Sequence, residues 1–198
     1  MASSGRSADE VVTLGGDLMA QGADVVEFEV SAHRRGPTLL ELLPRFISAT
    51  PNLPVSVRIE RPDQAPVALG AGAAMLSGAG VDDDEVLRQC VDAGVSVTLP
   101  AGHSADSLTR ALERWAAVGL DRERMILELV PEWSLAVPPV AASAGVPLAT
   151  WIGEGGDPAE AMGAGSAAVV SGVRVLRTDA PRSLRRVAHV ISAVGALR

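Results

Sequence analysis

Residues 94–130, with the sequence GVSVTLPAGHSADSLTRALERWAAVGLDRERMILELV, contain the unit from which the architecture can be derived. A short apolar run at 95–99 is followed by a loop and by residues 105–118, whose apolar positions have helical spacing. Gly119 follows the predicted helix, and a second apolar run begins at 125. Two strands joined by a helix are expected to be parallel, because the helix returns the chain to the end of the sheet where the first strand began.

The same unit recurs along the whole chain. Each apolar run has four to eight residues with little polar alternation, which is typical of strands buried on both faces of a parallel sheet. The predicted strands are 23–30, 55–59, 73–76, 95–99, 125–130, 147–152 and 173–176. The predicted helices are 8–21, 38–49, 62–69, 83–93, 105–118, 133–144, 158–171 and 181–194, with prolines weakening the second, third and sixth.

Seven strands alternating with eight helices, beginning with a helix, predict an α/β fold. It is a TIM-type (β/α) barrel shortened to about seven parallel strands. The alternative is an open doubly wound sheet. Residues 1–6 are expected to be a disordered tail and residues 7–198 a single domain. With seven strands, the sheet must close under strain or leave an edge between 23–30 and 173–176.

Composition excludes several classes of function. The chain has 198 residues and a formal charge of −7, which argues against a nucleic-acid binder. It contains no lysine, which excludes a Schiff-base or P-loop lysine. The single cysteine, Cys90, excludes an internal disulfide and favours a reducing cytoplasm. No apolar run reaches the roughly 18 residues of a membrane span, and three scattered histidines form no metal motif. We therefore expect no metal and no cofactor.

In a barrel, ligand-binding side chains lie at the carboxyl ends of the strands. Glu128 lies in a buried run, where an ionised carboxylate is costly unless it is paired, and Arg177 is its expected partner. The same reasoning applies to Glu27. The polar residues collected from all the strand ends are Glu27, Glu29, Arg58, Glu60, Ser77, His103, Glu128, Glu132, Glu154, Arg177, Thr178 and Asp179.

The histidines and tryptophans are weaker candidates. His33 is expected in a solvated loop, His103 at the start of a helix, and His189 in a structural position on the last helix. Trp133 and Trp151 are expected in the core, with stacking on a planar ligand as the alternative.

Five segments, in order, resemble motifs of the pterin-binding family of barrels, and of dihydropteroate synthases in particular. They are GADVVE at 22–27, PVSVRI at 54–59, GAAMLSG at 72–78, GLDRERMILE at 119–128 and GVRVLRTD at 172–179. The resemblance covers about residues 7–194 and implies the barrel fold of that family, with its first strand lacking a counterpart here. Whether that strand is missing by nature is left open.

The resemblance also implies where a ligand would bind, and it shows where this chain departs from the family. The family's third-strand aspartate falls on Arg58, its Asn-Asp pair on Ser77 and Gly78, and its strand-six aspartate on Glu128. Its lysine is missing, its last-strand arginine is Arg177, and the histidine two residues on falls on Asp179. The implied ligand-binding residues are Glu27, Glu29, Arg58, Ser77, Glu128, Arg177 and Asp179, with no catalytic residue among them.

Replacing an acid by Arg58 reverses both the charge and the hydrogen-bonding sense at the pterin position, at a cost of about 2–5 kcal/mol if buried. We therefore expect a degenerate relative without synthase activity that acts as a binding, structural or regulatory subunit. Its expected partner is a second copy or an intact paralogue. The alternative is an enzyme that binds a pterin- or folate-related or other small molecule through a rebuilt carboxylate and arginine pocket.

Overall fold

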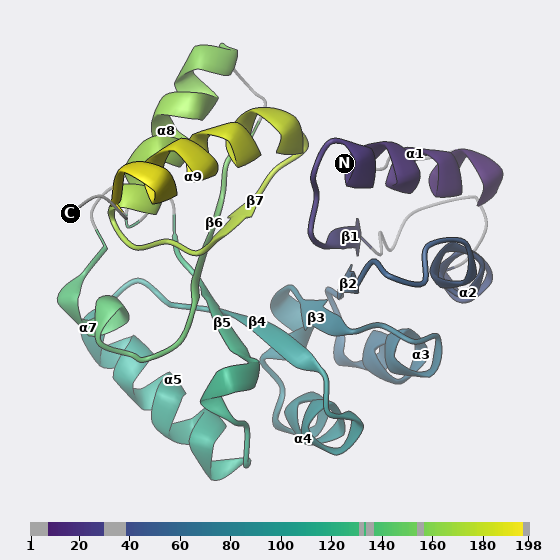
Figure 1. Ribbon diagram of the computed structural model, residues 1–198. Coiled ribbons are helices and arrows are strands. Elements are labelled where there is room, and N and C mark those ends of the chain that lie inside the picture. The colour runs from purple at the N-terminus through teal and green to yellow at the C-terminus, as the bar shows by residue number, and fades with distance from the viewer. Residues whose placement is uncertain (1–7, 30–38, 131–132, 134–136, 154–156, 196–198) are drawn as a thin grey trace.

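Seven parallel strands form one sheet in the computed structural model, which describes residues 8–29, 39–130, 133, 137–153 and 157–195. The strands pair strictly in chain order, and the sheet curls into a partial barrel (Figure 1). They are β1 (Val26–Glu29), β2 (Val55–Arg58), β3 (Met75–Ser77), β4 (Ser96–Pro100), β5 (Met125–Glu128), β6 (Leu148–Trp151) and β7 (Val175–Arg177). All seven predicted strands are confirmed. The doubly wound alternative is wrong, because the strand order never reverses.

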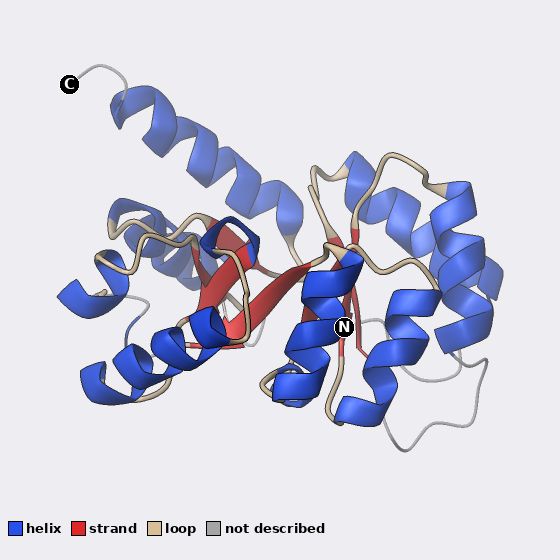
Figure 2. Cartoon of the chain, turned by 90° about the horizontal axis from the view of Figure 1, so that it is seen from below, coloured by secondary structure: helices blue, strands red, loops and turns tan. Residues whose placement is uncertain are grey.

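The helices lie around the outside of the curled sheet (Figures 1 and 2). They are α1 (Ala8–Ala20), α2 (Leu39–Ala49), α3 (Ala65–Gly70), α4 (Asp84–Ala93), α5 (Ala105–Ala117), α7 (Pro139–Ala142), α8 (Pro158–Val170) and α9 (Pro181–Gly195). Short 3₁₀ turns are η1 (Pro62–Gln64), η2 (Ala79–Val81) and η3 (Arg122–Arg124). The helix predicted over 133–144 is shorter, because Pro138 is extended and α7 begins only at Pro139. Residues 1–7, which include the predicted tail, lie outside the described residues.

The helix ends follow the sequence signals. Asp83 caps α4 by accepting hydrogen bonds from the backbone amides of Glu85 and Val86, at 2.9 and 3.2 Å. Asp157 caps α8 in the same way, and Gly94 ends α4 in the left-handed conformation. These caps fix the lengths of the loops and therefore the places where the strands begin and end.

The apolar core lies between the sheet and the helices. Alternate strand side chains such as Val57, Leu76 and Leu127 point outward and are fully buried against the helices, where Phe46 of α2 is also fully buried. The other strand side chains face the inside of the curl, and these include the charged residues at the strand ends. The fold therefore stores its apolar contacts on one face of the sheet and leaves the concave face for polar groups.

Strands β1 and β7 are the two edges of the sheet, and no ladder joins them in the part of the chain that the structure describes. We call the open side between them the seam. Across it, the Arg185 guanidinium of α9 donates to the Gly22 carbonyl and to Asp24, both at 2.7 Å. The predicted open edge is thus confirmed, and side chains rather than strand pairing span it. Among the described helices, none has both the length and the apolar character needed to cross a bilayer.

Candidate functional site

Four charged residues and one serine come together at the carboxyl ends of the strands. The Arg177 guanidinium on β7 donates from Nη2 to Glu27 on β1 and from Nη1 to Glu128 on β5. Ser77 and Arg58 complete the group, which we call the mouth cluster. The expected pair of Glu128 and Arg177 is present, and the same arginine also serves Glu27. One guanidinium therefore joins an edge strand to the middle of the sheet and to the opposite edge.

Glu27 is fixed by hydrogen bonds from two buried serines. Its Oε2 accepts from Ser77 Oγ at 2.7 Å and from Ser56 Oγ at 3.2 Å. The register places Glu27 opposite Ser56, so the two side chains lie on the same face of adjacent strands. Ser56 is missed by the sequence analysis, although its position two residues before Arg58 places both on one face of β2. These serines hold the Glu27 carboxylate in place independently of Arg177.

Arg58 lies at the mouth but is held loosely there. Its Nη1 is 3.9 Å from Glu128 Oε2, and its Nε donates to Glu60 at 3.3 Å. Its side chain is 30% exposed, against 14% for Arg177. Arg58 is therefore shared between Glu128 and the rim residue Glu60, whereas Arg177 is committed to the mouth cluster.

Trp151 provides an aromatic face beside this cluster. Its ring centroid lies 5.8 Å from Arg177 Cζ, and β6 and β7 are paired so that Trp151 is opposite Arg177. Trp151 is 47% exposed, so the expectation of a core position is wrong for it. The reason is strand alternation, which turns Trp151 to the concave face while Thr150 and Ile152 are buried. Trp133 is half-buried and packs against the core, as expected.

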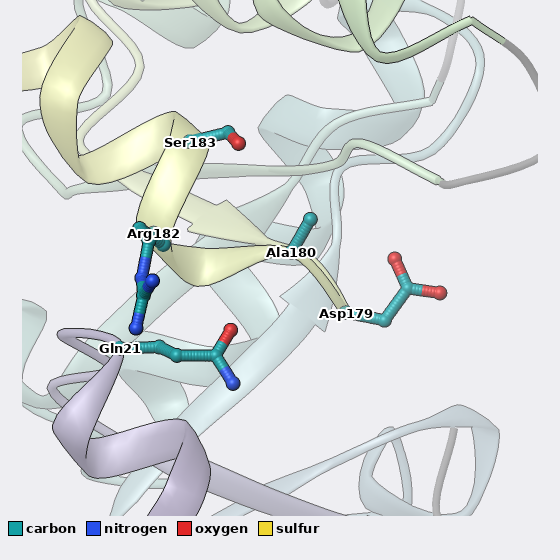
Figure 3. A pocket seen from close by; sticks show the side chains of 5 residues that line it. All are labelled: Gln21, Asp179, Ala180, Arg182 and Ser183. Carbon is teal, nitrogen blue, oxygen red and sulfur yellow. The ribbon is translucent and has the colours of Figure 1, made fainter.

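Two predicted site residues stay outside the mouth cluster. Glu29 is exposed, and no hydrogen bond or ion pair of its side chain is found among the described residues. Asp179 lies beyond Arg177 at a hollow of about 350 Å³ in the seam, and Figure 3 shows its carboxylate pointing away from Gln21 and Arg182. Its Oδ1 is buried and has no hydrogen-bond partner in the described part of the chain.

The remaining candidates have structural roles or lie outside the described residues. His103 is exposed and directly precedes Ser104, the N-cap of α5, as expected of a residue at a helix start. Thr178 accepts a hydrogen bond from the Ala180 amide at 3.0 Å, and His189 is exposed on α9. His33, Glu132 and Glu154 lie outside the described residues.

The charges of the mouth cluster balance internally. Two carboxylates face two guanidinium groups, whereas Glu29, Glu60 and Asp179 add three negative charges around them. Across the residues described, no group of histidine, cysteine, aspartate or glutamate side chains has an arrangement suited to a metal ion. The mouth is thus an acidic rim around a neutralised centre, with one aromatic face.

Solved structures of dihydropteroate synthases are similar to this chain over nearly its whole length. The enzyme from Stenotrophomonas maltophilia, solved with imidazole bound in its active site, matches with a TM-score of 0.82 at 18% identity. The match covers 96% of this chain and 89% of that one. This chain has the dihydropteroate synthase fold. The enzyme from Xanthomonas albilineans, in complex with indole-2-carboxylic acid and 6-chloroguanine, matches at 0.80 with 21% identity over 96% and 86% of the two chains.

The enzyme from Coxiella burnetii, in complex with pteroic acid, also has a TM-score of 0.80, with 16% identity over 97% of this chain and 87% of that one. No protein-family model and no curated protein matches the sequence. The dihydropteroate synthase fold expected from the five segments is therefore confirmed at the level of structure, with sequence identity too low to transfer an activity.

Proposed function

We propose that this chain is a dihydropteroate synthase-like protein without synthase activity, acting as a binding, structural or regulatory subunit. The observation that carries the proposal is the double pairing of Arg177 with Glu27 and Glu128. By resemblance, this arginine occupies the position of a family ligand-binding residue. In this chain its two terminal nitrogens are already engaged by carboxylates of the protein itself.

Diphosphate displacement needs a cationic, preorganised anion site. Freeing Arg177 for a diphosphate would leave two carboxylates unpaired next to the incoming negative charge, which is unfavourable on both counts. Arg58 is the other cation of the mouth, and it is shared between Glu60 and Glu128. The sequence contains no lysine that could take over this role. These features together support loss of the synthase reaction.

The subunit part of the proposal rests on the surface. The strand edges at the seam are unpaired in the described residues, and unpaired edges favour association. The outer helices also expose apolar side chains, namely Met162 and Val170 on α8 and Val190 and Val194 on α9. We propose a second copy of this chain, or an intact paralogue, as the partner, within a reducing cytoplasm consistent with the single buried Cys90.

Trp151 favours a second candidate function. An exposed indole next to a guanidinium is suited to stacking on a planar ring. The alternative is therefore a small-molecule-binding enzyme, for a pterin, folate or other ligand, whose pocket is rebuilt from the mouth cluster. Calorimetry with pterins, folates and 4-aminobenzoate separates the two, because micromolar binding lost in Arg177→Ala supports the alternative and absence of heat supports the subunit.

The proposal is tested directly by a synthase assay. The purified chain is incubated with hydroxymethyl-dihydropterin diphosphate and 4-aminobenzoate, alone and mixed with an active synthase as positive control. We expect no dihydropteroate from the chain alone, and turnover above background would overturn the proposal. Light scattering gives the association state, where a mass of about twice 20.3 kDa supports self-association. A monomer that captures no barrel protein from its native host would contradict the subunit role.

A further inference from the structure

The Arg177 guanidinium is held as a bound planar cation would be. Carboxylates from two different strands accept its two terminal nitrogens, and the Trp151 ring lies 5.8 Å from its central carbon. Its side chain is only 14% exposed, so the group is largely enclosed. Charge-assisted hydrogen bonds in the plane and an aromatic face alongside are what a guanidinium ion requires.

We propose that Glu27, Glu128 and Trp151 form a binding site for small planar cations of the guanidinium class, which the Arg177 side chain occupies as an internal ligand. The inference deepens the proposed function, because it names the chemistry that the mouth accepts and what blocks it. A free ligand of this class gains access when the Arg177 side chain leaves the site. An anion gains nothing from that movement, because it would then face two unpaired carboxylates.

The acidic half of this site is built without help from the arginine. Ser77 and Ser56 are 0% and 2% exposed, and both donate to the Glu27 oxygen that Arg177 does not use. Removal of the Arg177 side chain therefore leaves Glu27 oriented toward the vacated space. Glu128 keeps Arg58 at 3.9 Å, a distance at which the ion pair only weakly competes with an incoming cation.

Shape as well as charge distinguishes the expected ligands. A guanidinium ion is planar and can donate to two separate carboxylates while it faces an indole ring. An alkylammonium ion carries the same charge on one tetrahedral nitrogen and cannot reproduce this arrangement. Truncation of Arg177 to alanine removes the atoms of one N-ethylguanidinium ion, which is therefore the matched probe, and ethylammonium is its control.

The experiment measures the melting temperature of Arg177→Ala with increasing N-ethylguanidinium or ethylammonium chloride at constant ionic strength. We expect a saturable rise of about 3–6 °C for N-ethylguanidinium at tenfold its dissociation constant, and none for ethylammonium. The wild-type chain should show no rise, because its site is filled. Adding Glu27→Gln to Arg177→Ala should weaken the binding at least tenfold by calorimetry.

Arg185→Ala is the matched arginine control, since Arg185 pairs with Asp24, whose side chain is 82% exposed. It should show no saturable response to N-ethylguanidinium. Equal responses to both cations, equal rescue of Arg185→Ala, or no response of a folded Arg177→Ala would overturn the inference. If Arg177→Ala does not fold unaided, recovery of folded protein on refolding with N-ethylguanidinium but not ethylammonium supports it, and recovery with neither overturns it. Because no pterin is present, these outcomes are independent of the synthase assay.

Discussion

Arg177, at the end of β7, is hydrogen-bonded to Glu27 on β1, although the two residues are 150 positions apart and their strands are opposite edges of the sheet. The same guanidinium contacts Glu128 on β5. One side chain thus performs at the mouth what a strand ladder would perform in a closed barrel. Stability, access to the mouth and closure of the seam all depend on this contact.

Replacing Arg177 by methionine should destabilise the fold strongly. Two carboxylates lose their shared partner, and the cost is about 2–4 kcal/mol, below that of a fully buried pair because both remain about a quarter exposed. Urea unfolding measures the change. The control is Arg88→Met, whose pair with Glu85 lies on the surface of α4 and should cost less than about 0.5 kcal/mol. Equal losses in the two variants would contradict a special role for Arg177.

The two glutamates of β1 should respond differently to loss of charge. Glu27→Gln removes the carboxylate that pairs with Arg177 and accepts from two serines, and it should cost about 1–3 kcal/mol. Glu29→Gln alters an exposed side chain two residues further on and should stay within about 0.5 kcal/mol of wild type. Unfolding free energies at neutral pH decide the comparison, and a reversed order would place the functional carboxylate at Glu29.

Stability should fall between pH 9 and pH 11 because of one thiol. Burial raises the pKa of Cys90 from 9.0 to about 11, so in this range the unfolded chain loses the proton more readily than the folded chain. The stabilising effect is complete below pH 9 and is lost as the pH rises through 11, by about 2–3 kcal/mol in total. The sequence has no lysine and no tyrosine, so no other side chain titrates in this window. Urea midpoints across it should decline for wild type and stay level for Cys90→Ala.

Two glycine-to-alanine substitutions should have opposite effects. A Cβ at Gly80 would lie 2.7 Å from the backbone of Arg61, which cannot move aside cheaply, so Gly80→Ala should cost about 1–3 kcal/mol. A Cβ at Gly163, inside α8, meets nothing within 4 Å, and Gly163→Ala should add about 0.5–1 kcal/mol. Thermal unfolding measures both. A neutral Gly80→Ala would mean that the loops after β2 and β3 are packed less closely than described.

Much of the fold could be predicted because its signals are local. Apolar runs flanked by caps such as Asp157 and glycines such as Gly94 specify each strand and helix without knowledge of the rest. The pair of Glu128 and Arg177 was also predictable, since a carboxylate in a buried run requires a partner. The sequence analysis thus succeeds where one short segment contains the information.

The rest of the site depends on geometry that no segment contains. Contact between Arg177 and Glu27 depends on how far the sheet curls, and the place of Asp179 depends on where the chain turns outward into α9. The exposure of Trp151 follows from which face of β6 is concave, which the apolar run at 147–152 does not reveal. Ser56 could have been found from strand alternation, because it shares a face with Arg58.

The strictly sequential strand order has a consequence for how the protein is made. Each strand pairs only with its neighbours in the chain, so the sheet can grow from its amino-terminal end during synthesis, as low contact order favours. Arg177 emerges late, after both of its glutamates are in place. The contact that closes the seam is therefore the last to form on the ribosome, and a nascent chain halted before β7 would leave Glu27 and Glu128 open to any cation nearby.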